Sequence, residues 1–491
     1  MTTTPALLRS LIDGRWEESG GELVSTNPAR PDEVVAQGPR ASLEDVSRAV
    51  EAARRAAPSW SHTPVHERGA VLVRAAGHLE ADADTLGREL SREEGKTLAE
   101  GRGEVLRAAQ ILRYYGSEGD RSAGELFHSP RPGERILVTR KPVGVVGVIT
   151  PFNFPIAIPA WKIAPALVYG NTVVWKPANT VPLLATRLAE ALVEAGLPDG
   201  VLNLLQGTGE LGGAIVDHPG IDAITFTGST AVGREVASTA ALRGVPVQAE
   251  MGGKNAAVVL ADADLDLASE QVLFGAFRST GQKCTATSRL IVVDEVADAF
   301  MERLIARLDA WIVGDPTDEN VHMGPVVGPQ QAARIRAGIG ASVDRGARLA
   351  YGTDLDLPPT VDPTCFIAPT VLELPDEPAA GADPAWREEF FGPVLAVRRA
   401  RNTGEAVDFA NDSEFGLSAS IFTQDVSYAL DAMEQLKVGI LHVNSESAGA
   451  DPHVPFGGAK KSGLGPKEQG TAAREFFTST TTVYLRGGRR G

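Results

Sequence analysis

The chain is poor in cysteine, with two in 491 residues. Two thiols cannot build a disulfide framework, so a reducing compartment is expected and we predict a cytoplasmic protein. The sequence also lacks any run of about 18 apolar residues, and its first residues lack a basic and then apolar leader. Neither a membrane span nor a secretory signal is therefore predicted.

Positive charge is scarce as well. There are 47 Lys and Arg residues against 63 Asp and Glu residues, a formal net charge of −16. This balance disfavours a surface that binds polyanions, although it leaves room for local basic pockets. No nucleic-acid partner is expected.

What is present is the composition of a large globular α/β protein. The chain exceeds the size at which a single hydrophobic core stops growing, so at least two lobes are predicted. Its residues are 43% hydrophobic and 22% charged, with 52 glycines that allow many tight loops. This composition is typical of folded proteins.

The hydrophobic pattern predicts where the lobes lie. A short β start at 11–16 precedes helices, of which the first follows a capping-box-like signal at Ser42 and the others lie near 67–79, 83–94 and 97–115. From Val143 onward, short buried strands alternate with helices, which predicts parallel sheets with crossover helices and a lobe boundary near Gly252 and Gly253. The predicted strands are 143–150, 172–176, 201–205, 223–226 and 247–250 in the first lobe, and 255–260, 289–293, 347–351, 394–398, 417–422 and 439–443 in the second.

Two further strand-like segments, 134–141 and 476–485, have no partner nearby in the sequence. An uncovered edge strand invites association, so contact between subunits is one explanation for them.

One of the two thiols stands in an unusual setting. Cys284 lies in a small, polar, glycine-containing turn between an apolar helical pattern at 265–277 and a β-branched run at 290–293. This predicts an exposed thiol at a helix–turn–strand junction, where backbone N–H groups would lower its pKa and donate to an oxyanion. A lone Cys is more often a small core residue, and Cys365 fits that interpretation.

Two other polar residues follow predicted strands. Asn153 is either a turn former or a side-chain amide that donates to a developing oxyanion. Glu250 is either a surface carboxylate or a general base for water. The sequence around each residue leaves both interpretations open.

Several weaker signals complete the pattern. Lys176 ends a strand at the edge where open α/β sheets bind ligands, although a single Lys there is usually solvated. The turn at 226–233 follows a strand and opens a helix, so its N–H groups could hold a phosphate, but it is not a G-x-G-x-x-G sequence. Aromatic turns at 388–393 and 455–458 follow.

In this order, and over almost the whole chain, these six motifs resemble those of the NAD(P)-dependent aldehyde dehydrogenase superfamily. The resemblance implies the α/β aldehyde dehydrogenase fold, a small aldehyde as substrate, and a homodimer or homotetramer. The implied parts are a Rossmann-like cofactor-binding domain at 1–121 and 143–251, an α/β catalytic domain at 252–452, and a small β oligomerisation element at 122–142 and 467–491.

The resemblance also implies residue roles. Cys284 would be the nucleophile, Glu250 the general base, and Asn153 with the Cys284 backbone N–H the oxyanion hole, in a reaction that passes through a thiohemiacetal and a thioester. Residues implied to bind NAD or NADP are Thr150, Pro151, Phe152, Lys176, Ala178, Asn179, Gly228, Ser229, Gly233, Glu389 and Phe391. Residues implied at the substrate are Phe154, Trp161, Arg278 and Phe456, and no metal is implied.

Within the superfamily, the segments 149–162, 453–458 and 465–470 are most similar to α-ketoglutarate semialdehyde dehydrogenases, which oxidise 2,5-dioxopentanoate to 2-oxoglutarate. At the position of Asn179, NAD-preferring relatives usually carry an acidic residue that repels the 2′-phosphate of NADP. The neutral Asn179 therefore leaves NADP possible as the cofactor. Arg278 matches an Arg that binds the distal carboxylate in succinic semialdehyde dehydrogenases. The second Arg of those relatives corresponds to Trp161 here. Arg278 could equally form an ion pair with a neighbouring Asp or Glu.

Three alternatives stay open. The chain could be a succinic semialdehyde or broad-specificity aliphatic aldehyde dehydrogenase. It could be a CoA-acylating relative, although those relatives generally lack the base at Glu250. It could also be a binding or structural protein on the same fold, which would have no need of Cys284, Glu250 and Asn153 together.

Overall fold

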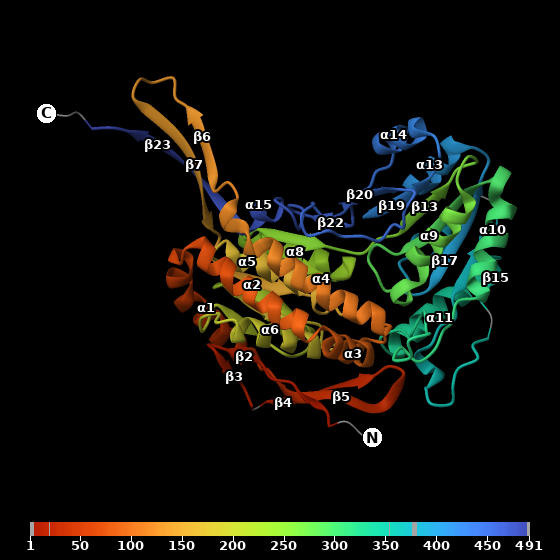
Figure 1. Cartoon of the computed structure of the whole chain (residues 1–491), viewed down its shortest axis with the longest axis horizontal. Helices are drawn as coiled ribbons and strands as arrows, with labels where there is room; N and C mark the ends of the chain where they lie inside the picture. Colours follow the sequence, from red (N-terminus) through yellow and green to blue (C-terminus); the bar gives the residue numbers. More distant parts are fainter. Residues whose placement is uncertain (1–3, 19, 353, 376–380, 489–491) are drawn as a thin grey trace.

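The computed structural model describes residues 4–18, 20–352, 354–375 and 381–488. This part of the chain forms five sheets, one of eight strands, one of seven, two of three and one of two. Figure 1 shows one body that contains the N-terminal helices, a second body built from the green to blue part of the chain, and a narrow projecting arm. The architecture is a mixed α/β fold, as the sequence predicts.

The eight-stranded sheet has a parallel centre and antiparallel edges, in the order β22-β12-β11-β8-β9-β10-β2-β3. Its strands are β2 Leu11–Ile12, β3 Arg15–Trp16, β8 Val145–Ile149, β9 Thr172–Lys176, β10 Leu202–Leu204, β11 Ala223–Thr227, β12 Val247–Glu250 and β22 Gly463–Leu464. Every residue of β8, β9, β10 and β11 is buried. Strands covered on both faces are expected to be apolar throughout, which is why the sequence located these so well.

Helices cover both faces of this sheet. They are α1 Leu43–His62, α2 Val65–Ala81, α3 Ala83–Glu94, α4 Leu98–Gly116, α5 Ala157–Val168, α6 Leu183–Glu194, α7 Gly209–Asp217 and α8 Thr230–Arg243. Within β9, Val173 and Trp175 belong to a core shared with α5 and α6, whereas Val174 belongs to a core shared with α1, α7 and α8. The Ser42 capping box predicted for α1 is present, and α4 begins with a second one, made by Thr97 and Glu100.

The seven-stranded sheet follows the order β15-β16-β17-β14-β13-β19-β20, and all its pairs are parallel except β15 with β16. Its strands are β13 Asn255–Val259, β14 Thr287–Val293, β15 Arg348–Tyr351, β16 Thr370–Glu373, β17 Val394–Ala400, β19 Ser418–Phe422 and β20 Ile440–Val443. The helices of this body are α9 Leu265–Phe277, α10 Asp294–Asp309, α11 Pro329–Asp344, α12 Pro384–Arg387, α13 Thr403–Asn411 and α14 Val426–Gln435. β16 was not among the predicted strands.

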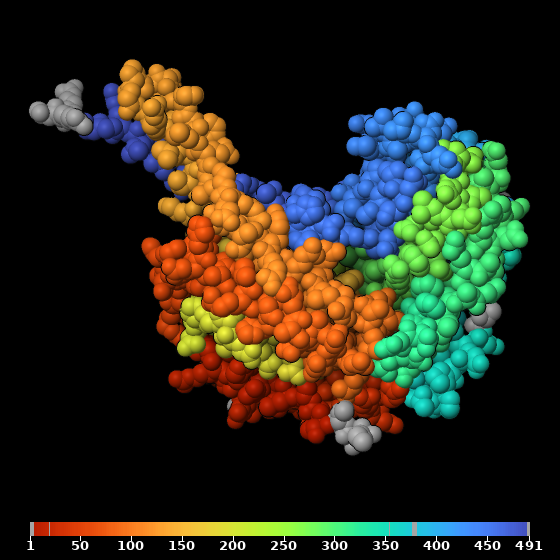
Figure 2. Space-filling model, in the orientation of Figure 1, coloured from red at the N-terminus to blue at the C-terminus, as the bar shows by residue number. Residues whose placement is uncertain are grey.

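The projecting arm is an antiparallel sheet in the order β23-β7-β6, with bounds β6 Gly124–His128, β7 Glu134–Pro142 and β23 Thr478–Arg486. The two strands that lack a partner in the nearby sequence therefore pair with each other, in a register that runs from Thr478 opposite Pro142 to Arg486 opposite Glu134. Figure 2 shows the arm standing clear of the body.

The first 40 residues differ from the prediction. They contain a three-stranded sheet, β1 Ala6–Leu7, β4 Gly21–Asn27 and β5 Arg30–Arg40, where the sequence predicted only the short β start. β5 includes Pro31, Asp32, Gly38 and Pro39, which are residue types depleted in strands. The low strand propensity of this segment is why the sequence did not predict β5. The remaining elements are η1 Glu118–Asp120, η2 Arg278–Gly281, η3 Pro363–Cys365, β18 Phe415–Gly416, β21 Ala459–Lys460 and α15 Ala473–Phe477.

The predicted domain limits remain a prediction. Gly252 and Gly253 lie between β12, in the first large sheet, and β13, in the second. β22 returns to the first sheet from a stretch outside all the predicted ranges. Residues 1–3, 19, 353, 376–380 and 489–491, which fall within those ranges, lie outside the described residues. Of the helices described, none is long and apolar enough to cross a membrane.

Candidate active site

Cys284 lies in the connection between α9 and β14. A 3₁₀ turn, Arg278–Gly281, follows α9, so the predicted order of helix, turn and strand is present. Ser279 and Thr280 both have a φ of 53°, a left-handed conformation that persists in such residues only when the surroundings hold it. Asn255, at the start of β13, helps to hold the segment, because its side-chain amide donates to the Cys284 carbonyl oxygen at 2.8 Å.

The prediction that this thiol is exposed and has a lowered pKa is wrong. Cys284 is only partly accessible. Burial, together with the carboxylates of Glu389, Glu250 and Glu468, raises the pKa of Cys284 to about 12, and the backbone N–H of Thr285 opposes this only in part. Desolvation and nearby negative charge outweigh the N–H group, so the thiol is protonated near neutral pH and needs a base to react.

Two cavities meet at Cys284, which among the described residues is the one that lines both. The larger has a volume of about 480 Å³ and the smaller about 290 Å³. Figure 2 shows a hollow on this face where the orange segment that contains α4 meets green and blue segments. A thiol between two cavities can meet two different molecules at once.

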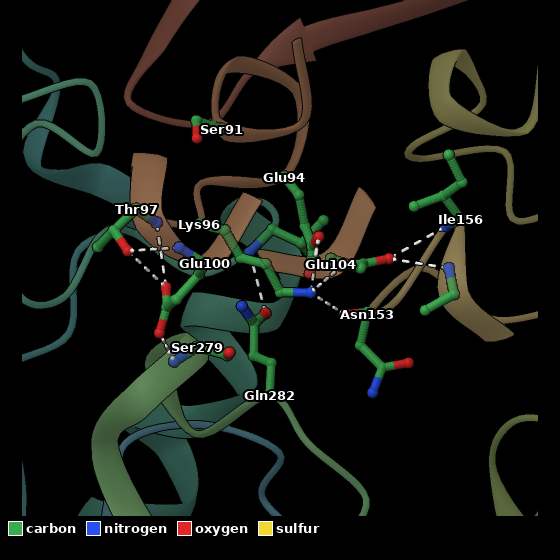
Figure 3. Close-up of polar contacts among 12 residues, drawn as sticks. Ser91, Glu94, Lys96, Thr97, Glu100, Glu104, Asn153, Ile156, Ser279 and Gln282 are labelled. Carbon is green, nitrogen blue, oxygen red and sulfur yellow. Dashed lines mark hydrogen bonds and ion pairs between the residues drawn. The ribbon is translucent and has the colours of Figure 1, made fainter. Parts of the chain in front are cut away.

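Asn153 lies in the loop between β8 and α5 and lines the larger cavity together with Cys284. The residue is 2% exposed, and its backbone carbonyl accepts a hydrogen bond from Lys96 Nζ. Within the described part of the chain its side-chain amide has no hydrogen-bond partner, and Figure 3 shows that side chain directed away from Lys96. The amide is therefore free to donate to a group bound beside the thiol.

Glu250 ends β12 and faces a glycine pair. Its Oε2 accepts from the N–H of Gly458 at 3.1 Å, and a Cβ on Gly457 would stand 2.4 Å from Oε1. Burial, and then the Glu468 carboxylate, raise the pKa of Glu250 well above its usual range. The side chain lines neither cavity, so it must turn from the glycines to serve water at Cys284. A raised pKa suits a general base that works near neutral pH.

The larger cavity gathers ten of the eleven residues predicted to bind the cofactor, which are Thr150, Pro151, Phe152, Lys176, Ala178, Asn179, Gly228, Ser229, Glu389 and Phe391. Gly233 is the exception. It lies within α8, where a Cβ would be 2.7 Å from the Met251 side chain, so it allows the helix to pack closely and does not line the cavity.

The features of this cavity fit a dinucleotide. Lys176 is 6% exposed, burial lowers its pKa to about 8, and no acidic partner for it is present among the described residues. Such an ammonium needs a polar ligand, which ribose hydroxyls or phosphate oxygens would supply. Ser229 is the N-cap of α8 and lines the same cavity, so the positive dipole end of that helix lies beside it.

The other end of the larger cavity holds a buried carboxylate. Glu389 Oε1 accepts from the N–H of Gly253 at 2.9 Å, and burial raises the pKa of Glu389 to about 7. Phe391 packs edge-on against Phe152, with ring centroids 5.6 Å apart. In the described part of the chain, no group of three His, Cys, Asp or Glu side chains is arranged to hold a metal ion.

The smaller cavity contains all four residues predicted at the substrate. Phe154, Trp161 and Phe456 form an aromatic wall, in which Trp161 and Phe456 have centroids 5.5 Å apart. Arg278 lies over the ring of Phe274 at 3.6 Å, and its side chain is 44% exposed. Its Nη1 is 3.6 Å from Glu446 Oε1, so the alternative of an Arg beside an acid also has a structural basis.

The sequence did not identify two charged residues beside Arg278. Lys283 Nζ is 3.6 Å from Glu446 Oε2 and donates to the backbone carbonyl of Phe274 at 3.2 Å. Lys283 immediately precedes Cys284, and this proximity was the available signal. Glu446 lies in the loop after β20, and nothing in its local sequence connects it with the thiol.

A second group of charges that the sequence did not single out comes from the start of α4. Lys96, Glu100 and Glu104 line the smaller cavity, and they form buried polar contacts with the Asn153 loop and the Cys284 turn (Figure 3). For Glu100 and Glu104 the spacing of four residues was a usable signal, because it predicts one face of a helix, whereas Lys96 precedes α4. A charged face is usually solvated, however, and only the tertiary structure shows that this one is buried.

Comparison with known proteins agrees with this arrangement. Residues 16–483 match the model of the "Aldehyde dehydrogenase family". The chain is 41% identical over 480 residues to an alpha-ketoglutaric semialdehyde dehydrogenase of Bacillus subtilis, covering 97% of this chain and 98% of that protein. It is 39% identical over 481 residues to a 2,5-dioxopentanoate dehydrogenase of Saccharolobus solfataricus, with the same coverage.

A solved structure supports the same assignment. A betaine aldehyde dehydrogenase variant from Staphylococcus aureus in complex with NAD⁺ superimposes with a TM-score of 0.93 at 32% identity, covering 98% of this chain and 96% of that one. The family match spans nearly the whole chain, and every residue that lines the two cavities lies within it. The chain belongs to the aldehyde dehydrogenase family.

Proposed function

We propose that the aldehyde oxidation typical of this family takes the hydrolytic route here, with Cys284 as nucleophile, Asn153 as oxyanion donor and Glu250 as general base. The observation that carries this proposal is the position of Cys284 between two cavities, one suited to a dinucleotide and one to an aldehyde.

In the first half-reaction, the Cys284 thiol loses its proton to solvent and the sulfur bonds to the aldehyde carbon. The carbonyl π electrons move to oxygen, and the Asn153 amide and the Cys284 backbone N–H donate to that oxyanion. When bound, the nicotinamide supplies the hydride acceptor, so that the carbon keeps sulfur, regains its double bond to oxygen and becomes a thioester.

In the second half-reaction, Glu250 takes a proton from water as the water oxygen bonds to the thioester carbon. The carbon–sulfur bond then breaks, the thiolate of Cys284 leaves, and a carboxylic acid is released. The presence of a base at Glu250 favours water over CoA as the acceptor of the acyl group.

The substrate we propose is a short semialdehyde acid, such as 2,5-dioxopentanoate. Two relatives carry that substrate in their names. The smaller cavity supports it through charge, because four cations line it, Lys96, Arg107, Arg278 and Lys283, against the three carboxylates of Glu100, Glu104 and Glu446. A substrate carboxylate would balance the remaining positive charge, and Lys283 provides the second cation that Trp161 does not.

Cofactor choice follows from Asn179. This neutral side chain is exposed and lines the larger cavity. A 2′-phosphate would meet no negative charge there, so we propose that both NAD and NADP are accepted.

The projecting arm supports a homodimer or homotetramer. Leu126, Phe127, Tyr484 and Leu485 are exposed apolar side chains on β6 and β23. Burying them against another subunit would remove this surface from water. A nucleophile that must stay a free thiol is also consistent with a reducing compartment such as the cytoplasm.

A panel of aldehydes tests the proposal. The ratio kcat/KM should be higher for α-ketoglutarate and succinic semialdehydes than for butanal and pentanal, with either NAD or NADP. Equal values for charged and neutral aldehydes would contradict the carboxylate subsite. No turnover of any aldehyde would contradict the function itself.

A further inference from the structure

A buried ion pair outside the three catalytic positions is built against the loop of Asn153 (Figure 3). Lys96, between α3 and α4, is 3% exposed, and its Nζ is 2.6 Å from Glu104 Oε2. The same Nζ donates to the backbone carbonyl of Asn153 and lies 3.8 Å from the ring centroid of Phe154. The ammonium therefore contacts two adjacent residues in the middle of the loop.

The other oxygen of Glu104 holds the end of the same loop. Oε1 accepts from the N–H groups of Ile156 at 3.1 Å and Ala157 at 3.2 Å. α5 begins at Ala157, and its own N-cap residue makes no side-chain cap. A carboxylate from α4 thus satisfies the first donors of α5, where the helix dipole also favours negative charge.

A third member of the cluster is Glu94. Glu94 Oε2 is 3.4 Å from Lys96 Nζ, yet neither carboxyl oxygen of Glu94 has a hydrogen bond within the described residues. Burial raises the pKa of Glu94 well above its usual range, and the Lys96 ammonium opposes this shift. The shorter ion pair of the cluster is the one between Lys96 and Glu104.

Stability does not explain this arrangement well. A buried ion pair is often no more stabilising than apolar side chains of the same volume, because both charges lose their hydration. What the pair does supply is orientation. With the Asn153 carbonyl held on Lys96, the Asn153 side chain points the other way, and it lines the larger cavity beside Cys284.

The same helix also holds the turn that carries the thiol. Glu100 Oε1 accepts from the N–H of Ser279 at 2.7 Å, while Oε2 accepts from the N–H and hydroxyl of Thr97. α4 therefore contacts the loop of the amide donor through Glu104 and the turn of the nucleophile through Glu100. A rigid helix that holds both sets the separation between them.

We infer that Lys96 and Glu104 are positioning residues for the oxyanion donor: they fix the backbone of Asn153 so that its amide meets the oxygen of the aldehyde bound at Cys284. The inference rests on the proposed function, because it requires Asn153 to be that donor.

The test is Lys96→Met, measured as single-turnover formation of reduced nicotinamide and, separately, as the rate of Cys284 alkylation by iodoacetamide. Losing an oxyanion donor outright lowers rates by about 10²–10³-fold, so a misaligned donor should lower hydride transfer by roughly 10–100-fold. Alkylation develops no oxyanion and should stay within about twofold of wild type. Equal slowing of both reactions, or of neither, would overturn the inference.

The matched control is Glu93→Gln. Glu93 neighbours Glu94, is equally buried, and accepts from the N–H of Leu183 at the start of α6 instead of from the Asn153 loop. Glu93→Gln should leave the rate of hydride transfer unchanged. A loss equal to that of Lys96→Met would assign the effect to general disturbance of buried charge and overturn the inference.

Asn153→Ala separates this inference from the proposed function. In that background, Lys96→Met should slow hydride transfer little further, and additive losses would overturn the inference alone. If Asn153→Ala transfers hydride at the wild-type rate, the oxyanion role itself fails.

Glu104→Gln, which keeps an oxygen for Ile156 and Ala157 but removes the charge, repeats the test if Lys96→Met does not fold.

Discussion

The two cavities that meet at Cys284 are built in different ways. Turns and strand ends form most of the larger one, including the start of α8 and the ends of β8 and β9, and its cation Lys176 has no acidic partner among the residues that the structure describes. The smaller one is lined by side chains from segments far apart in the chain, and its cations Lys96, Arg278 and Lys283 each lie beside a carboxylate. The larger cavity is therefore suited to recognise its ligand by backbone shape and dipole, and the smaller one by paired charge.

Cys284→Ala should separate binding from chemistry, since this is the residue common to both cavities. We expect turnover to fall by at least about 10⁴-fold, as it does when other catalytic nucleophiles are removed. Cofactor binding, followed by quenching of protein fluorescence, should not change, because the larger cavity keeps its remaining lining residues.

Cys365→Ala is the matched control. Cys365 is 1% exposed and packs in a core of the second body, away from both cavities. Its removal should lower thermal stability slightly and leave turnover intact. Turnover by Cys284→Ala above a trace would contradict the nucleophile assignment.

The pH dependence of alkylation tests the environment that both cavities create for the thiol. Because the pKa of Cys284 is raised to about 12, the thiolate fraction should rise with pH throughout the accessible range. In a Cys365→Ala background, the rate with iodoacetamide should increase about tenfold per pH unit, or roughly a thousandfold from pH 7 to 10. An ordinary thiol would level off above about pH 9, so a plateau there would show that burial does not suppress ionisation.

Arg278→Ala and Lys283→Met should damage the smaller cavity selectively. Each removes a charged contact to the substrate carboxylate worth about 1.5–3 kcal/mol, so KM for semialdehyde acids should rise by roughly 10–100-fold. KM for pentanal and for the cofactor should change little.

Arg107→Ala provides the comparison within the same cavity. Arg107 also lines it, but it pairs with Asp451 at 3.0 Å, a shorter contact than the 3.6 Å between Arg278 and Glu446. Arg107→Ala should have little effect on KM for semialdehyde acids. If Arg107→Ala raises KM for the acids as much as Arg278→Ala does, the cavity attracts carboxylates by general charge and has no defined subsite.

Asn179→Glu should produce the smallest of these effects, in the larger cavity. A carboxylate near a bound 2′-phosphate costs about 1–2 kcal/mol in a partly open site, so KM for NADP should rise by roughly 5–30-fold while KM for NAD stays nearly constant. Asn179→Gln, which adds length without charge, should leave the ratio unchanged. An unaltered NADP to NAD ratio in Asn179→Glu would show that selectivity is set elsewhere.

The same contrast explains what the sequence could predict. Buried parallel strands are continuous apolar runs, and the turns after them carry local motifs, so β8, β9 and the residues Thr150, Lys176 and Ser229 could be located from the sequence alone. Lys96 and Glu104 could not, because their contacts with Asn153 and Ile156 join segments about 50 residues apart through folding. The local sequence also gave the wrong pKa for Cys284, since the carboxylates around it come from distant strands and loops.

The central claim is that Cys284 carries an acyl group which Glu250 releases to water. Glu250→Gln, mixed with a semialdehyde acid and NAD(P)⁺ and quenched in acid within the first turnover, should accumulate the acyl adduct on the peptide that contains Cys284. Mass spectrometry should find close to one adduct per chain, together with a matching burst of reduced nicotinamide and little steady turnover. Reduced nicotinamide that forms without any adduct on Cys284 would contradict the account.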